Sequence, residues 1–201
     1  MCASGASKII AIVGMCGAGK STLSDELVSR GWGYVRLGQI TLDILKERGM
    51  KINEANEKAV REAVRKEHGM GAFAKLNLPK FDAILEKQNL AADGLYSWSE
   101  YKILKDYYGA RLTVMAVYAP PALRHERISK RQMGAGDTDL RNRNFSKEEA
   151  RSRDYAEIEN IEKSGPIAMA DYTILNTGAM EEFKTNILKT LDDYASKNQT
   201  N

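Results

Sequence analysis

Cysteine is scarce in this chain, which has only Cys2 and Cys16 among its 201 residues. One stands near the start of the chain and the other in a glycine-rich segment, so neither placement predicts a disulfide and a reducing compartment is expected. No apolar run approaches the ~18 residues of a membrane-spanning helix, and the opening residues lack the apolar core of a secretory leader. We therefore expect a soluble, cytoplasmic protein with no membrane partner.

The chain also has no large excess of charge of either sign, because 30 lysines and arginines nearly balance 27 aspartates and glutamates and the formal net charge is only +3. The arginines are nevertheless unevenly spread. Seven of the thirteen fall within 124–153: Arg124, Arg127, Arg131, Arg141, Arg143, Arg151 and Arg153. That segment lacks the interleaved aromatic side chains on which bases stack, since the only aromatic residues in or near it are Phe145 and Tyr155. Nucleic acid is therefore not an expected partner.

What the chain does have is alternating strand and helix patterns over its length, with 43% hydrophobic residues. This alternation predicts one α/β domain whose parallel sheet carries helices on both faces. The expected strands are Ile9–Val13, Tyr34–Leu37, Leu90–Asp93, Leu112–Tyr118 and Asp171–Leu175. We expect a core (8–38, 88–120 and 165–195), a mostly helical insertion (39–87) and a lid region (121–164).

The segment Gly14–Ser21 (GMCGAGKS) matches the phosphate-binding pattern G-x-x-x-x-G-K-[ST], between an apolar strand and a helix that starts at Lys20. Main-chain N–H groups of such a turn, together with the helix dipole, favour an anion. Lys20 would reach the β- and γ-phosphates, and the Ser21 hydroxyl would hold Mg²⁺. The residues expected to bind the nucleotide here are Gly14, Cys16, Gly17, Ala18, Gly19, Lys20, Ser21 and Thr22.

Asp93 stands at the carboxyl end of an expected strand and is followed by Gly94. Ligands of such sheets bind beyond the carboxyl ends of the strands, so Asp93 is expected to face the same crevice as the glycine-rich loop. There it would support Mg²⁺ or act as a general base. The alternative is that Asp93 only begins an Asp-Gly turn.

Arg127 and Arg131 are four residues apart on an expected helix and therefore project from one face. Arg153 lies beyond a glycine-containing loop that could fold over the phosphates as a lid. We expect these three guanidinium groups to act in catalysis, with a solvated basic face as the alternative.

An acceptor site is less clearly marked than the donor site. Its candidates lie at the end of the second strand, within the expected insertion and just after the third strand. They are Arg36, Arg61, Arg65 and Tyr96. Asn176, just after the last strand, is a candidate for contact with a purine, although a turn or cap role is equally compatible with its position.

These features in this order resemble the P-loop nucleotide kinases, and in particular the group described as nucleotide kinase-related or dephospho-CoA kinase-like. The resemblance spans about residues 8–190 and includes Gly69–Ala74, Asp93–Leu95, Arg153–Glu157 and Ala170–Asn176. It implies a three-layer P-loop fold with strand order 2-3-1-4-5, an acceptor-binding insertion after strand 2 and an arginine-rich lid after strand 4. It also implies that Arg127 stacks on the donor base, Arg131 contacts phosphates and Asn176 lies near adenine.

This sequence differs from adenylate kinases at two positions where those enzymes carry arginines that bind the acceptor. Adenylate kinases carry an arginine shortly after the second strand and another after the third, whereas this chain has Leu42 and the run Leu95–Trp98 there. The acceptor phosphate is normally held by such arginines. The leading hypothesis is an ATP- and Mg²⁺-dependent kinase that acts on a small nucleotide-like acceptor. The alternatives are transfer to a hydroxyl acceptor, as in dephospho-CoA kinase, and a nucleotide-binding regulatory module or slow ATPase.

Overall fold

The computed structural model of the protein describes residues 7–131 and 146–199. Its sheet has five parallel strands in the order β2-β3-β1-β4-β5, which confirms the predicted fold class and strand order. The strands are β1 (Ile9–Val13), β2 (Gly33–Arg36), β3 (Leu90–Asp93), β4 (Leu112–Tyr118) and β5 (Tyr172–Leu175). At the centre of the sheet, Ile9 of β1 pairs with Leu90 on one side and Leu112 on the other.

Two strands begin or end one residue away from their predicted limits. The second strand starts at Gly33, which pairs with Leu90, and ends before Leu37. The last strand starts at Tyr172 because the Asp171 carboxylate accepts a hydrogen bond of 2.7 Å from the Val114 N–H. The Asp171 side chain thus accepts a hydrogen bond that a main-chain carbonyl would accept in the regular pairing of β4 with β5.

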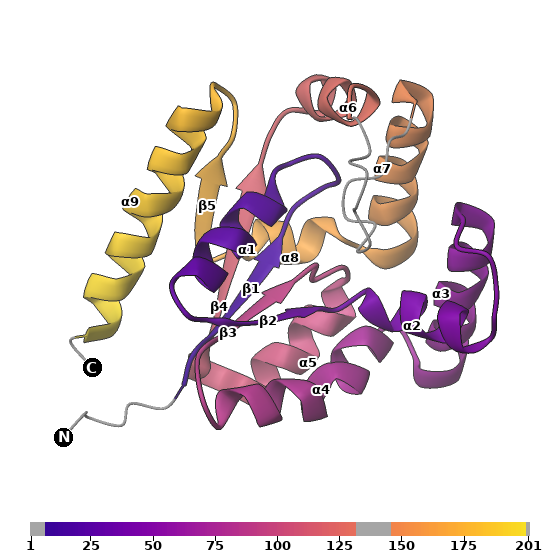
Figure 1. Cartoon of the computed structure of the whole chain (residues 1–201), viewed down its shortest axis with the longest axis horizontal. Coiled ribbons are helices and arrows are strands. Elements are labelled where there is room, and N and C mark those ends of the chain that lie inside the picture. Colours follow the sequence, from indigo (N-terminus) through magenta and orange to yellow (C-terminus); the bar gives the residue numbers. More distant parts are fainter. Residues whose placement is uncertain (1–6, 132–145, 200–201) are drawn as a thin grey trace.

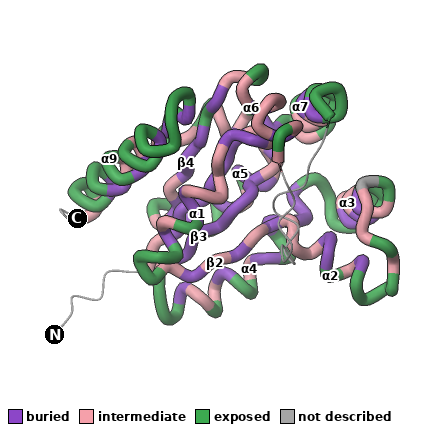
Figure 2. Tube along the Cα trace, turned by 45° about the horizontal axis from the view of Figure 1, so that its top comes forward, coloured by how far each residue is buried: buried purple, intermediate pink, exposed green. Residues whose placement is uncertain are grey.

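The two faces of the sheet bury different residues, because side chains alternate along a strand. Ile10 and Ile12 belong to the core under α1 (Lys20–Ser29) and α9 (Met180–Gln199). The intervening residues Ile9, Ala11 and Val13 belong to the opposite core, under α4 (Ala72–Leu85) and α5 (Trp98–Tyr108). The result is three layers, with the buried strands between helices whose outer surfaces are exposed (Figures 1 and 2).

The remaining helices lie in the connections from β2 to β3 and from β4 to β5. They are α2 (Gln39–Glu47), α3 (Glu54–His68), α6 (Pro121–Ser129), α7 (Lys147–Ile161) and the short α8 (Ser164–Ala168); a 3₁₀ turn, η1 (Gly109–Arg111), precedes β4. Helix α2 packs against α3, and α6 packs against α7 (Figure 1). Within the described ranges no helix is both long and apolar enough to cross a lipid bilayer.

The segment predicted as an insertion is helical, as expected, since it contains α2, α3 and α4. Its separation from the core as an acceptor-binding unit stays a prediction, and so does the lid. Residues 132–145 of the predicted lid, including Arg141 and Arg143, lie outside the described residues.

Candidate functional site

The glycine-rich loop between β1 and α1 is packed closely against two other elements. Gly14 has a φ of +144°, and a Cβ there would lie 2.4 Å from the carbonyl oxygen of Val117 in β4. Gly17 has a φ of +79°, and its Cβ would lie 2.9 Å from the carbonyl oxygen of Arg124 in α6. Glycine is therefore required at both positions, because any side chain would displace the loop from β4 or from α6.

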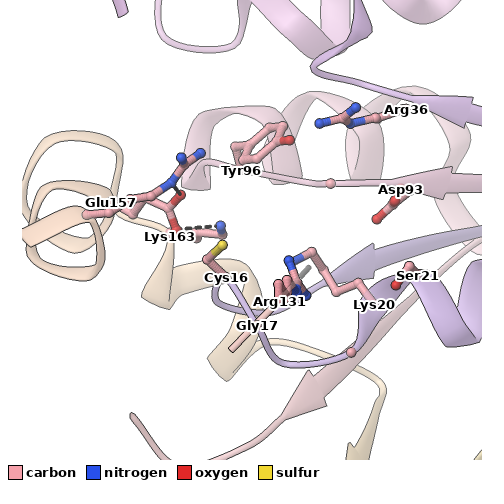
Figure 3. Close-up of a pocket in the computed structure, with 13 residues that line it drawn as sticks. Cys16, Gly17, Lys20, Ser21, Arg36, Asp93, Tyr96, Arg131, Glu157 and Lys163 are labelled. Carbon is pink, nitrogen blue, oxygen red and sulfur yellow. Dashed lines mark hydrogen bonds and ion pairs between the residues drawn. The ribbon is translucent and has the colours of Figure 1, made fainter. Parts of the chain in front are cut away.

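A polar pocket opens beside this loop at the carboxyl edge of the sheet (Figure 3). Five lining residues come from the loop and the start of α1. The others come from the end of β2, from the end of β3 and the turn that follows it, from the second residue after α6, from α7, and from the residue that precedes α8. The lining residues are Cys16, Gly17, Gly19, Lys20, Ser21, Arg36, Asp93, Gly94, Tyr96, Arg131, Arg153, Glu157 and Lys163. Among these lining residues the cationic side chains outnumber the carboxylates.

Lys20 is folded back onto its own loop. Its Nζ donates hydrogen bonds to the carbonyl oxygens of Gly14 (2.9 Å) and Met15 (3.2 Å). Burial, followed by the positive charge of Lys163, lowers the pKa of Lys20 to about 8, against the opposing effect of Asp93 and Glu157. An anion placed in the pocket would favour the charged form of Lys20 and so raise its pKa again.

Asp93 ends β3 with its carboxylate directed into the pocket, as Figure 3 shows. Asp93 is buried, with 8% of the residue exposed. Its Oδ2 accepts a hydrogen bond of 3.1 Å from the Tyr34 hydroxyl, whereas its Oδ1 has no hydrogen-bond partner among the described residues. A buried oxygen without a partner is costly and marks a place for a further ligand. The described residues contain no group of three or more metal-ligating side chains. The Ser21 hydroxyl and Asp93 would still suit Mg²⁺, which keeps waters and phosphate oxygens as its other ligands.

Of the predicted catalytic arginines, Arg131 and Arg153 line the pocket and Arg127 does not. Arg127 Nη1 donates to the carbonyl oxygen of Asn176 at 3.0 Å, and Asn176 Nδ2 donates to the carbonyl oxygen of Ala18 at 2.8 Å. Arg127 and Asn176 thus connect α6 and the end of β5 to the backbone of the glycine-rich loop. Gly14, Ala18 and Thr22 also lie outside the lining of the pocket.

The acceptor candidates divide into two pairs. Arg36 and Tyr96 line the pocket. Arg61 Nη1 lies 3.4 Å from the Glu57 carboxylate, and the Arg65 guanidinium lies 5.1 Å from the ring centre of Phe73. Neither Arg61 nor Arg65 is among the pocket-lining residues.

Two lining residues, Glu157 and Lys163, were given no role by the sequence reasoning. Lys163 Nζ lies 2.6 Å from Glu157 Oε2, and Arg153 Nε lies 3.4 Å from Glu157 Oε1. Burial opposes ionisation of Glu157, but the positive charges of Lys163 and Arg153 prevail and lower its pKa to about 2. Glu157 belongs to a segment that carried the family resemblance, whereas no motif in the sequence marks Lys163.

A buried network beneath the pocket was also missed. Arg124 is 4% exposed and forms a bidentate pair with Asp154 of α7, at 2.9 and 2.7 Å. The same guanidinium donates to the carbonyl oxygens of Cys16 and Ala119, each at 3.0 Å, and His125 Nε2 lies 2.8 Å from Asp154. Arg124 therefore links the glycine-rich loop to the helix that carries Arg153 and Glu157.

Comparison with known sequences gives a consistent family assignment. A family described as "AAA domain" matches residues 10–157. A UPF0200 protein of Thermococcus kodakarensis is 32% identical over 191 residues, which cover 94% of this chain and 99% of that protein. A UPF0200 protein of Sulfurisphaera tokodaii is 35% identical over 180 residues, which cover 89% of this chain and 92% of that protein.

Comparison with solved structures identifies the same fold in small kinases. A shikimate kinase from Bacteroides thetaiotaomicron superposes with a TM-score of 0.55 and 12% identity, covering 94% of this chain and 98% of that one. A gluconokinase from Sinorhizobium meliloti gives a TM-score of 0.56 and 11% identity, with 97% of each chain covered. At these identities the likeness establishes a kinase-like P-loop fold.

Proposed function

This chain belongs to the UPF0200 family and to the family described as "AAA domain", and on that basis we propose that it is an ATP- and Mg²⁺-dependent phosphotransferase. The acceptor is a small molecule, nucleotide-like in the leading version of the proposal. The observation that carries it is one pocket in which a phosphate-binding loop, a strand-end carboxylate and several cations meet. Phosphoryl transfer needs this combination, because catalysis depends on alignment and on positive charge around the phosphoryl oxygens.

The donor triphosphate would bind along the loop from Gly14 to Thr22, where main-chain N–H groups and the start of α1 favour anions. Lys20 would leave its contacts with the Gly14 and Met15 carbonyl oxygens and bind the β- and γ-phosphates. Arg127 and Asn176 are proposed to border the donor nucleoside, since they adjoin the outer side of the loop at Ala18.

Ser21 and Asp93 would hold Mg²⁺, either directly or through water. Bound there, the ion would neutralise negative charge that develops on the phosphate oxygens. Arg131, just after α6, and Arg153 of α7 would contribute further positive charge.

Arg36 and Tyr96 are proposed to contact the acceptor, because both line the pocket near Asp93 (Figure 3). A phosphate acceptor is already an anionic nucleophile and needs no general base. A hydroxyl acceptor would give its proton to the Asp93 carboxylate while its oxygen attacks the γ-phosphorus. Arg61 and Arg65 stay weaker candidates, since they contact Glu57 and Phe73.

Steady turnover of Mg–ATP with a panel of acceptors tests this proposal. The panel contains ribo- and deoxynucleoside monophosphates, nucleosides, dephospho-CoA, shikimate and gluconate. We expect at least one acceptor to raise ADP formation well above the rate without acceptor, and Lys20→Ala to abolish the increase. Failure of every acceptor to raise turnover would remove the phosphotransferase assignment.

One observation favours a second function, a nucleotide-binding regulatory module or slow ATPase. Two of the four arginine and tyrosine side chains predicted for an acceptor do not line the pocket. In that case hydrolysis of ATP would be slow and independent of any acceptor, and binding of a partner protein would depend on the nucleotide.

A further inference from the structure

Lys163 is buried to an extent unusual for a lysine, with only 2% of its surface exposed, yet it lines the pocket. It follows Glu162, which ends α7 with a left-handed φ of +53°, the only such non-glycine residue in the described part of the chain. A non-glycine residue keeps a left-handed backbone conformation only where the surrounding structure stabilises it, and such residues are often found at functional sites. Here the turn directs the next side chain back toward the pocket.

Two contacts of the ammonium and one of the backbone hold Lys163 in place. Its Nζ lies 2.6 Å from Glu157 Oε2 and 5.1 Å from the ring centre of Tyr96. The backbone N–H of Lys163 also donates to the carbonyl oxygen of Glu157, at 3.1 Å. Because Glu157 is ionised at neutral pH, its negative charge compensates the positive charge of the buried ammonium.

Lys163 and Lys20 reach the pocket from opposite sides, with Cys16 and Arg131 in the region between them (Figure 3). Their like charges disfavour one another, since Lys163 is the largest influence after burial that lowers the pKa of Lys20. A ligand that both ammonium groups would attract is an anion placed between them. The segment of the phosphate loop that lies there is its first half, at Cys16 and Gly17, away from Ser21.

We propose that Lys163 is a second phosphate-binding lysine, which contacts the γ-phosphoryl group of the triphosphate from the side opposite Lys20. This inference rests on the proposed phosphotransferase function. During transfer the bond from the γ-phosphorus to its bridging oxygen breaks, the electron pair stays on ADP, and the acceptor oxygen forms the new bond. Lys163 keeps its protons throughout and supplies positive charge, while Glu157 holds its ammonium in place before the nucleotide binds.

The test compares two ligands that differ in the γ-phosphate. Binding of Mg–ADP and of the magnesium complex of the non-hydrolysable analogue AMPPNP is measured by calorimetry for the wild type and for Lys163→Met. A hydrogen bond between charged groups is worth enough to change affinity by roughly 10-fold or more. We expect Lys163→Met to lose about that factor for AMPPNP and less than about 2-fold for ADP, and Lys163→Arg to recover part of it.

Lys163→Met also leaves the Glu157 carboxylate with one cation fewer, so the double variant Lys163→Met/Glu157→Gln separates folding from binding. It is expected to unfold at a higher temperature than the single variant and still to lack the preference for AMPPNP. The matched control is Lys197→Met in α9, whose Nζ also lies 2.6 Å from a carboxylate, that of Asp193, and is 62% exposed. This control should bind both ligands as the wild type does.

Equal losses for ADP and AMPPNP, or no loss for either, would overturn the role of Lys163 and leave the proposed function standing. If the wild type binds neither ligand, the proposed function itself fails and the inference falls with it. The two failures are therefore distinguished by the wild-type titrations alone.

Discussion

At the scale of single residues, Arg127 and Arg131 are four positions apart but have different surroundings. Arg131 lines the pocket, whereas Arg127 contacts the carbonyl oxygen of Asn176 beside the loop. A guanidinium that faces the transferred group should act on the transition state. One that supports the donor side of the loop should act on nucleotide binding.

We therefore expect Arg131→Ala to lower kcat by roughly 100-fold with little change in the KM for ATP. Arg127→Ala should mainly raise the KM for ATP. Both constants are measured with an acceptor from the panel, or as ATP hydrolysis if no acceptor is found. The control is Arg151→Ala, because Arg151 is exposed on α7 and contacts the Tyr155 hydroxyl. The reverse pattern would mean that the two roles are exchanged.

At the scale of elements, the start of α5 depends on a capping box whose acidic member is completely buried. Glu100 Oε2 accepts hydrogen bonds from the N–H groups of Tyr96 (2.9 Å) and Ser97 (3.1 Å). Burial nevertheless raises the pKa of Glu100 to about 7, although those bonds and Arg65 act against it. The same loop carries Tyr96 into the pocket, so the charge of Glu100 bears on the shape of the site.

The pH dependence follows from the sign of this shift. The folded protein binds the Glu100 proton more tightly than the unfolded chain, so stability falls as pH rises from about 4.5 to about 7 and the loss is complete above that range. The total is about 3 kcal/mol, because the pKa of Glu100 rises from 4.5 to about 7 on folding. Glu100→Gln should remove this part of the profile in urea unfolding measured between pH 5 and pH 8.

Glu149→Gln is the matched control, because Glu149 holds the same position in the exposed capping box at Ser146. It should leave the shape of the stability profile unchanged. Parallel profiles for the wild type and Glu100→Gln would show that Glu100 does not titrate in this range.

The contact of α6 with α7 gives a second prediction at this scale. Removing one member of the buried Arg124–Asp154 pair leaves the other without its partner of opposite charge, with only His125 beside Asp154 or the carbonyl oxygens beside Arg124. Arg124→Met and Asp154→Asn should each lower the free energy of unfolding by about 3 kcal/mol or more, and the double variant should lose less than their sum. Urea unfolding of the three variants measures this coupling. Strict additivity would show that the pair is not a unit.

At the scale of the whole molecule, the sheet could be predicted because its signals are local. Apolar runs such as Leu112–Tyr118 define strands, and the glycine-rich loop has a recognisable spacing. The strand order came from the family resemblance, and it is confirmed. The positions of Lys20, Ser21, Asp93 and Arg131 around one pocket follow from parallel strands whose carboxyl ends share one edge.

The rest of the site depends on contacts between residues far apart in the sequence. Arg124 contacts Asp154, which is 30 residues away in the sequence, and the carbonyl oxygen of Cys16, which is 108 residues away. No local sequence pattern predicts either contact. Lys163 enters the pocket through a left-handed turn at Glu162, a residue type that does not predict one. Arg61 and Arg65 appeared equivalent to Arg36 because a helical arginine that contacts its own helix or a neighbouring ring looks the same in sequence as a pocket arginine.

The central claim is that the pocket binds a magnesium–nucleoside triphosphate with Lys20 against its phosphates. Calorimetric titration with Mg–ATP at pH 9, in two buffers with different ionisation enthalpies, tests it most directly. Burial and the charge of Lys163 lower the pKa of Lys20 to about 8, so the side chain is mostly neutral at this pH and the phosphates should favour its charged form. The account predicts one nucleotide per chain with uptake of about one proton, and weak binding without uptake for Lys20→Met. Absence of heat with Mg–ATP and Mg–GTP at millimolar concentration, or binding to Lys20→Met as tight as to the wild type, would contradict it.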